Sequence, residues 1–350
     1  MHPGERYRQL IDGSARGIVP ALLRGALCIG SVPYGAATRM RNWLFDRGWK
    51  KTVKAGCPVV SVGNLTVGGT GKTPMVEYIA RYYRQSDRRV VLLSRGYGAV
   101  NGPNDEALVL EENLPDVPHL QGIDRVALAQ TALVELESEV IVLDDGFQYR
   151  RLARDLNLLL IDATQPWGFG WQLPRGLLRE SKRGLGRADA IVLTRCNQIA
   201  SASLQVLLSD LRKRSKNRFV FASQHEPEGL MDSEHRQEKL SALQNRPVLA
   251  FCGIGNPVSF FNQLKALEAD ICRQVTFPDH HPYTRADVQM LTRYAQELPA
   301  TGWMITTQKD LVKLRVDRLA DRRLLALKIG LQLQDQAESF HSLLDRVFQQ

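Results

Sequence analysis

Short runs of β-branched and aliphatic residues alternate along the chain with segments whose apolar residues have helical spacing. The runs lie at 59–62, 88–94, 140–143, 158–161, 190–193, 247–252 and 302–307. Strands that alternate with helices are typical of a parallel α/β sheet. We therefore expect an α/β fold, with ligands bound at the turns that follow the strands.

The turn after the first run is rich in glycine. Val59–Val62 leads into a loop with four glycines, then into Lys72-Thr73 and a helical pattern from Met75. This order is that of a P-loop, whose backbone N–H groups and lysine hold phosphates while the hydroxyl ligates Mg²⁺. The nucleotide-binding residues expected on this basis are Gly68, Gly69, Thr70, Gly71, Lys72 and Thr73.

One position departs from the usual P-loop pattern, because Thr66 stands where G-x-x-x-x-G-K-[ST] has its first glycine. An ordinary glycine-rich turn before a helix is the alternative interpretation. The ordered combination of strand, glycines, lysine and threonine favours the P-loop.

A second strand carries acids at its end, since Val140–Leu143 is followed by Asp144 and Asp145. An acid in this position is typical of a Walker-B strand that holds Mg²⁺. Asp162 ends another apolar run and is a rival for this role. Two adjacent acids favour the first strand, so we expect metal ligands at Thr73, Asp144 and Asp145 and little contribution from Asp162.

The chain of 350 residues is long enough for two domains. We expect an N-terminal amphipathic helical segment at 1–54, a P-loop domain at 55–225, a linker at 226–246 and a smaller α/β domain with a C-terminal helix at 247–350. Five scattered cysteines without a C-x-x-C pair argue against a zinc site and favour reduced thiols in a cytosolic setting.

Positive charge is concentrated at the N-terminus. Residues 1–56 hold ten basic and three acidic side chains, which accounts for seven of the nine excess charges. Such a segment favours an anionic partner. No base-reading module follows, so we expect no nucleic-acid partner.

The N-terminal segment also has the composition of a membrane-surface helix. Residues 17–37 are apolar but are broken by Pro20, Arg24 and Pro33, which predicts that they fall short of a membrane span. Residues 38–51 then interleave aromatic with basic side chains, as interfacial helices do. We expect Trp43, Phe45 and Trp49 to anchor in an anionic bilayer and Arg39, Arg41, Arg47, Lys50 and Lys51 to face its phosphates. A helix packed on its own domain is the alternative.

Arginines follow the predicted strands as well. Arg95 ends the strand at 88–94, and Arg179 lies in the long loop at 165–187, so both are candidate substrate contacts. Arg125, at the start of a predicted helix, is a further catalytic candidate. The strand at 190–193 lacks the guanine-reading motif that P-loop GTPases carry there, which disfavours a GTPase.

These motifs together resemble the tetraacyldisaccharide 4'-kinase family, the lipid A 4'-kinases of Gram-negative bacteria. The resemblance rests on GNLTVGGTGKTP, SRGYG, NDE, DDGFQ, LPRGLLRE, FCGIGNP, FPDHHPYT and TTQKD, which follow in this order over nearly the full chain. Thr66 is itself typical of the family. Gln308 in place of glutamate and Arg150 in place of a frequent histidine are departures, and neither removes a residue assigned to chemistry.

The resemblance implies a kinase that transfers the γ-phosphoryl group of ATP, with Mg²⁺, to the 4'-hydroxyl of a tetraacylated glucosamine disaccharide 1-phosphate in lipid A biosynthesis. It also implies a peripheral protein on the cytoplasmic face of the inner membrane. It further implies that Asp105 and His280 form a carboxylate–histidine dyad, which joins Lys72 and Arg125 as the catalytic candidates. His280 and the P-loop belong to different predicted domains, so we expect the two domains to close on the substrate. The alternative role for His280 and His281 is to anchor a loop. The alternative functions are a P-loop switch or metallochaperone NTPase and a soluble small-metabolite kinase.

Overall fold

The computed structural model describes residues 3–96, 104–215, 219–334 and 336–349. Tyr97 and Gly98 of the SRGYG motif lie outside these ranges. The chain forms two compact units, one from residues 1–97, 114–224 and 331–350 and the other from residues 98–113 and 225–330. Two segments therefore belong to units other than the predicted ones, since 98–113 joins the second unit and 331–350 the first.

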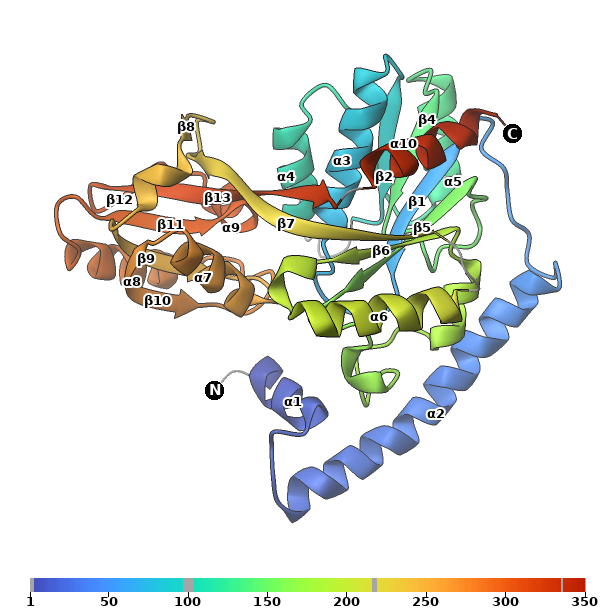
Figure 1. Ribbon diagram of the computed structural model, residues 1–350, viewed down its shortest axis with the longest axis horizontal. Coiled ribbons are helices and arrows are strands. Elements are labelled where there is room, and N and C mark those ends of the chain that lie inside the picture. The colour runs from blue at the N-terminus through green and yellow to red at the C-terminus, as the bar shows by residue number, and fades with distance from the viewer. Residues whose placement is uncertain (1–2, 97–103, 216–218, 335, 350) are drawn as a thin grey trace. The chain divides into compact units, whose positions relative to one another are not determined.

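The first unit is built on a parallel sheet, as the alternation of strands and helices predicts (Figure 1). The strand order is β7-β6-β5-β1-β4-β2-β3, and each neighbouring pair in it is parallel. The strands are β1 (Val59–Asn64), β2 (Val90–Ser94), β3 (His119–Gln121), β4 (Val140–Asp144), β5 (Leu156–Asp162), β6 (Ala190–Thr194) and β7 (Phe219–Met231). With β1 between β4 and β5, the loop that follows it leaves the middle of the sheet.

Helices cover this sheet through apolar side chains. The helix after the P-loop, α3 (Lys72–Gln85), packs on β1, β2 and β4, whereas α5 (Arg125–Val134) packs on β2 and β3. Leu208 and Leu211 of α6 (Ser201–Arg214) join a core cluster with Ile191 and Leu193 of β6. Short 3-10 turns lie at η1 (Gly168–Gly170), η2 (Lys182–Arg187) and η3 (Cys196–Gln198).

The C-terminal segment returns to the P-loop helix. In α10 (Ala337–Asp345), His341 bonds Tyr78 at 2.8 Å and stacks on Tyr82, and the buried Tyr83 donates to the Leu344 carbonyl. The turn η5 (Arg346–Phe348) follows. The P-loop helix is therefore held by the sheet on one side and by residues some 260 positions later in the chain.

The second unit contains its own, smaller sheet with strand order β10-β9-β11-β13-β7. Its strands are β8 (Gln237–Glu238), β9 (Pro247–Cys252), β10 (Asp270–Thr276), β11 (Trp303–Thr307), β12 (Arg318–Leu319) and β13 (Arg322–Leu333), and its helices are α4 (Asp105–Asn113), η4 (Leu240–Leu243), α7 (Pro257–Ala266), α8 (Arg285–Gln296) and α9 (Gln308–Leu314). The predicted linker at 226–246 is not an irregular connection, because β7 runs through to Met231 and β8 pairs with it.

At the N-terminus, α1 (Pro3–Asp12) is followed by one continuous helix, α2 (Ile18–Asp46). Pro20, Arg24 and Pro33 therefore interrupt the apolar run but not the helix. By length and composition alone α2 could cross a membrane, a property that a signal sequence or a soluble core helix can share. Little of its apolar stretch is buried, unlike that of a core helix.

Candidate active site

The P-loop enters α3 in the predicted way. Gly68 has φ 114° and Gly71, the residue before the helix, has φ 85°, which are backbone conformations that favour glycine. Lys72 and Thr73 are buried in the first turn of α3. Thr66 forms an antiparallel bridge with Leu178, an extended pairing that a residue with a side chain adopts without strain. This pairing explains why the loop needs no glycine at Thr66.

The paired aspartates lie beside this loop, because Asp144 ends β4 directly opposite Val62 of β1. The two carboxylates differ in their surroundings. Asp145 accepts two hydrogen bonds of 2.8 Å from Arg179 and lies 3.6 Å from Lys72 Nζ, whereas Asp144 is 4% exposed. The structure thus brings Lys72, Asp144, Asp145 and Arg179 together.

Charge at this site is balanced around Asp145. Burial acts to raise the pKa of Asp145, but Lys72, Arg179 and Arg125 outweigh it and hold that pKa below the usual value. Burial lowers the pKa of Arg125, opposed by Asp145 and Asp144 and reinforced by Arg95. Arg125 is 4% exposed and its guanidinium stacks on the Tyr149 ring, so it reaches the same cluster from the start of α5.

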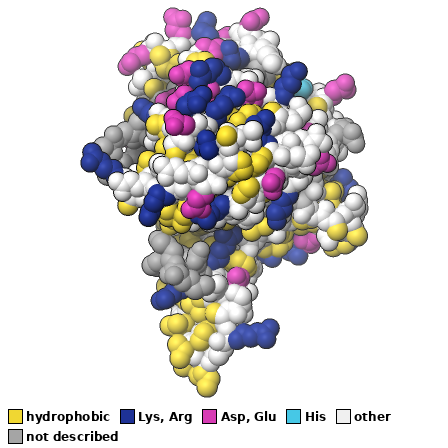
Figure 2. All heavy atoms as spheres, turned by 90° about the vertical axis from the view of Figure 1, so that its left-hand side faces the viewer, with side chains coloured by type: hydrophobic (Ala, Val, Ile, Leu, Met, Phe, Trp, Pro, Cys, Tyr) yellow, Lys and Arg dark blue, Asp and Glu magenta, His cyan; other side chains and the backbone are white. Residues whose placement is uncertain are grey.

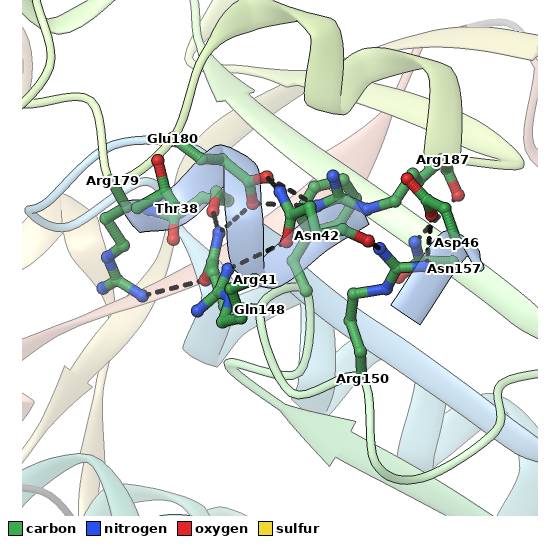
Figure 3. A network of polar contacts seen from close by, with 12 residues as sticks. Thr38, Arg41, Asn42, Asp46, Gln148, Arg150, Asn157, Arg179, Glu180 and Arg187 are labelled. Atoms are coloured by element: carbon green, nitrogen blue, oxygen red, sulfur yellow. Dashed lines mark hydrogen bonds and ion pairs between the residues drawn. The ribbon is translucent and has the colours of Figure 1, made fainter. Parts of the chain in front are cut away.

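A second buried carboxylate, Glu180, lies next to this cluster and was not expected from the sequence (Figure 3). It is 1% exposed and accepts hydrogen bonds from Asn42 at 2.9 Å, Gln148 at 3.0 Å and Arg187 at 2.8 Å. Gln148 also donates to the backbone carbonyl of Asn64, just before the P-loop, at 2.8 Å. Both residues belong to quoted motifs, LPRGLLRE and DDGFQ, but neither motif indicates that they meet.

Helix α2 packs against the loop that carries Arg179. Tyr34 donates to the Arg179 carbonyl at 2.9 Å, and Ser31 donates to the Gln172 carbonyl at 3.0 Å. Gly35 permits this approach, because a Cβ there would lie 2.8 Å from the Gln172 side-chain oxygen. One face of α2 is therefore tied to the segment that reaches Asp145.

The candidate dyad lies within the second unit. Asp105 starts α4, and its two carboxylate oxygens lie 2.9 Å from His280 Nδ1, 175 positions later in the chain. Lys313 lies 3.6 Å from Asp105, and Lys309 binds the adjacent Glu106 at 2.6 Å. The TTQKD motif supplies Lys309, and its unusual Gln308 donates to Asn113 at 3.1 Å.

Neighbouring charges and the shared hydrogen bond shift the pKa values of Asp105 and His280 in the directions that stabilise the pair. Burial opposes ionisation of Asp105, but His280, Lys309 and Lys313 lower its pKa to about 2. The hydrogen bond to Asp105 raises the pKa of His280 above its usual value, although burial acts against that shift. His281, by contrast, bonds Asp287 at 2.9 Å beside the capping box of α8, which is a loop-anchoring contact.

Asp162 and two residues of α2 have partners within the protein that the sequence did not indicate. Asp162, the rejected rival for the metal, is ion-paired with Arg195 at the end of β6. Phe45 lies beneath the Arg150 guanidinium, and Arg41 is half-buried and donates to the Asn42 side chain at 3.2 Å. Phe45 and Arg41 thus have partners within the protein, and their contact with a membrane stays a prediction.

Comparisons with known proteins agree on one family. A sequence profile described as tetraacyldisaccharide-1-P 4'-kinase matches residues 23–349. The tetraacyldisaccharide 4'-kinase of Anaeromyxobacter sp. (strain K) is 37% identical over 94% of this chain and 92% of its own length. That of Geobacter metallireducens is 38% identical over 84% of this chain and 89% of its own length.

A solved structure matches as well. The "apo" form of LpxK from Aquifex aeolicus, crystallised in complex with ATP, superposes with a TM-score of 0.74 at 31% identity and covers 93% of this chain and 99% of that one. These matches span both units and do not favour a switch or metallochaperone NTPase. On the residues matched and on the shared fold, the chain belongs to the tetraacyldisaccharide-1-P 4'-kinase family.

Proposed function

We propose that Lys72, the paired aspartates and the Asp105–His280 dyad carry out the family's reaction in this chain. The reaction is transfer of the γ-phosphoryl group of ATP to the 4'-hydroxyl of a tetraacylated disaccharide 1-phosphate. The observation that carries the proposal is the position of Lys72, which follows the glycine-rich loop and lies 3.6 Å from Asp145. Backbone N–H groups of residues 68–73 bind the phosphates, and Lys72 neutralises charge that develops on the transferring group.

The donor groups at this site fit Mg²⁺, which prefers carboxylate and hydroxyl oxygens. Asp144 ends β4 opposite Val62 and is buried beside the loop that leads to Thr73, so we assign the direct contact to Asp144 together with Thr73. Bound Mg²⁺ would supply charge neutralisation for the phosphates. Asp145 then serves to keep Lys72 and Arg179 in place.

The dyad prepares the acceptor. Asp105 fixes the tautomer of His280 by accepting from Nδ1, which leaves Nε2 to take the proton of the attacking hydroxyl. The His280 side chain is 51% exposed, so the nitrogen is accessible to a substrate. The dyad belongs to the second unit and the P-loop to the first.

The apolar face of α2 suits a lipid surface. Ile18, Val19, Leu22, Ile29 and Val32 are each at least 67% exposed, and Figure 2 shows hydrophobic side chains gathered at the lower tip, at the height where Figure 1 draws the start of α2. Exposed apolar residues of this number on one helix mark a docking surface. We assign it to the membrane that holds the lipid acceptor, on its cytoplasmic face.

The reaction itself is tested by mass spectrometry of a tetraacylated disaccharide 1-phosphate incubated with the enzyme, ATP and Mg²⁺. We expect product heavier by one phosphoryl group, and Lys72→Ala should lower kcat by about 10²-fold or more because one charge contact to the transferring group is lost. ATP hydrolysis without a phosphorylated lipid would support the switch NTPase instead. A folded Lys72→Ala enzyme with normal kcat would remove residues 68–73 from the phosphate site.

The two aspartates should respond differently to substitution. Asp144→Asn removes the proposed direct ligand and should raise the Mg²⁺ concentration needed for half-maximal rate. Asp145→Asn loosens Arg179 and Lys72, so we expect it to lower kcat with a smaller change in the Mg²⁺ requirement. Titrating Mg²⁺ against initial rate separates the two. A larger Mg²⁺ defect in Asp145→Asn would reverse the assignment.

The dyad makes the rate depend on pH. Protonated His280 cannot act as a base, so kcat/KM should rise with pH through the His280 pKa, which Asp105 raises. Asp105→Asn removes the groups that raise this pKa, so the acidic limb should move to lower pH while the plateau falls. His280→Ala should lose the limb, and the matched control His281→Ala should keep it. Strictly multiplicative effects of the Asp105 and His280 substitutions would show that they act separately.

If α2 docks on the membrane, substitutions on its apolar face should affect the lipid substrate but not ATP. Ile18→Ser, Leu22→Ser and Ile29→Ser together should weaken binding to anionic vesicles by about 10³-fold or more, since burying each side chain contributes about 1.5–3 kcal/mol. The apparent KM for the lipid should rise while that for ATP stays constant. Arg39 is exposed, and Arg39→Ser is the electrostatic control. Its effect on vesicle binding should vanish in high salt. A triple variant with a lower Tm and equal damage to both substrates would instead mean that α2 belongs to the core.

A further inference from the structure

Two side chains at the carboxyl end of β6 donate hydrogen bonds to backbone carbonyls of the P-loop. Thr194 Oγ1 donates to the Thr70 carbonyl at 2.9 Å, and Arg195 Nη2 donates to the Gly69 carbonyl at 2.7 Å. Thr194 is 0% and Arg195 8% exposed. Both side chains therefore act from the protein interior on consecutive peptide groups of the loop.

Arg195 is itself fixed before it reaches the loop. Its other terminal nitrogen is ion-paired with Asp162, which ends β5 opposite Thr194. Asp162 also accepts from the backbone and hydroxyl of Thr164. The Arg195 backbone has φ 57°, a left-handed conformation that turns the chain at the end of β6. Asp162 thus orients a guanidinium whose Nη2 donates to Gly69.

Because the peptide group is planar, these contacts also fix the direction of N–H groups that can bind phosphate. In a trans peptide, the carbonyl of one residue and the N–H of the next point in opposite directions. With the Gly69 and Thr70 carbonyls drawn toward β6, the N–H groups of Thr70 and Gly71 point away from β6. Those two N–H groups belong to the stretch that a P-loop uses to bind phosphate.

We propose that Thr194 and Arg195, with Asp162 acting through Arg195, are positioning residues that aim the N–H groups of the P-loop at the nucleotide phosphates. The inference rests on the proposed role of residues 68–73 as the phosphate site. It replaces the expectation that Asp162 contributes little. The three residues orient the donors that ATP meets and do not touch the reacting atoms.

Isothermal titration of the full-length protein with ATP and with adenosine tests this role. Thr194→Val keeps the side-chain volume but removes the donor, so ATP affinity should fall about tenfold, the loss of one hydrogen bond, and kcat should fall with it. Affinity for adenosine and KM for the lipid should stay within twofold, because adenosine has no phosphates. Thr194→Ser restores a donor and should restore ATP affinity.

Arg195 and Asp162 are tested as a pair. Arg195→Lys is the milder variant if Arg195→Met or Thr194→Val does not fold. Arg195→Met should reduce the ratio of ATP to adenosine affinity, and the exposed Arg212→Met on α6 is the matched control. Asp162→Asn should reduce the ratio alone but add little in the Arg195→Met background, since it acts through Arg195.

The outcomes separate this inference from the proposed phosphate site. If the Thr194 and Arg195 variants lower Tm but keep the ATP-to-adenosine ratio, both residues are only structural and the inference is wrong. Equal losses for ATP and adenosine would also overturn it. If Lys72→Ala leaves ATP affinity and kcat unchanged as well, the phosphate site itself is misplaced. Loss at Lys72 without loss at Thr194 and Arg195 rejects the inference alone.

Discussion

The first unit depends on keeping one carboxylate, that of Asp145, ionised among cations at the end of β4. The Asp145 side chain is 32% exposed, and the burial of the rest acts to raise its pKa. Arg179 and Lys72 prevent this, and in return Asp145 fixes both cations beside the P-loop. The position of Lys72 is therefore set by charge balance as well as by the loop that precedes it.

The same requirement links α2 to the site. Glu180 is buried as a carboxylate and needs donors on several sides, which Asn42, Gln148 and Arg187 supply (Figure 3). Removing any of these donors leaves part of a buried charge unsatisfied, a cost larger than that of losing the bond itself. The helix that carries the exposed apolar residues is thus joined to the residue next to Arg179.

Local sequence pattern predicts those parts of the site that lie close together along the chain, whereas the Asp105–His280 pair, 175 positions apart, was expected only from the family resemblance. The P-loop, the strand ending in Asp144 and the α/β class all follow from local pattern, because loop, strand and helix each have a short-range signature. Pairings over long separations have none. The contact of Tyr83 with α10 and the extension of β7 into the predicted linker depend on tertiary packing. Composition likewise could not show that Arg41 is half-buried, since that depends on which face of α2 meets the loop.

Neighbouring cations keep both Asp145 and Asp105 ionised, but the two carboxylates have different partners. Asp145 lies among cations that, in the proposed mechanism, it holds in place for the nucleotide. Asp105 is also kept ionised by lysines, with a pKa of about 2, but its nearest partner is a half-exposed imidazole. There the negative charge strengthens a base instead of fixing a cation, since a proton on His280 is stabilised by the carboxylate and Nε2 remains accessible. In the proposed mechanism, a carboxylate kept ionised by neighbouring cations thus serves binding in one unit and proton transfer in the other, according to what its partner presents to solvent.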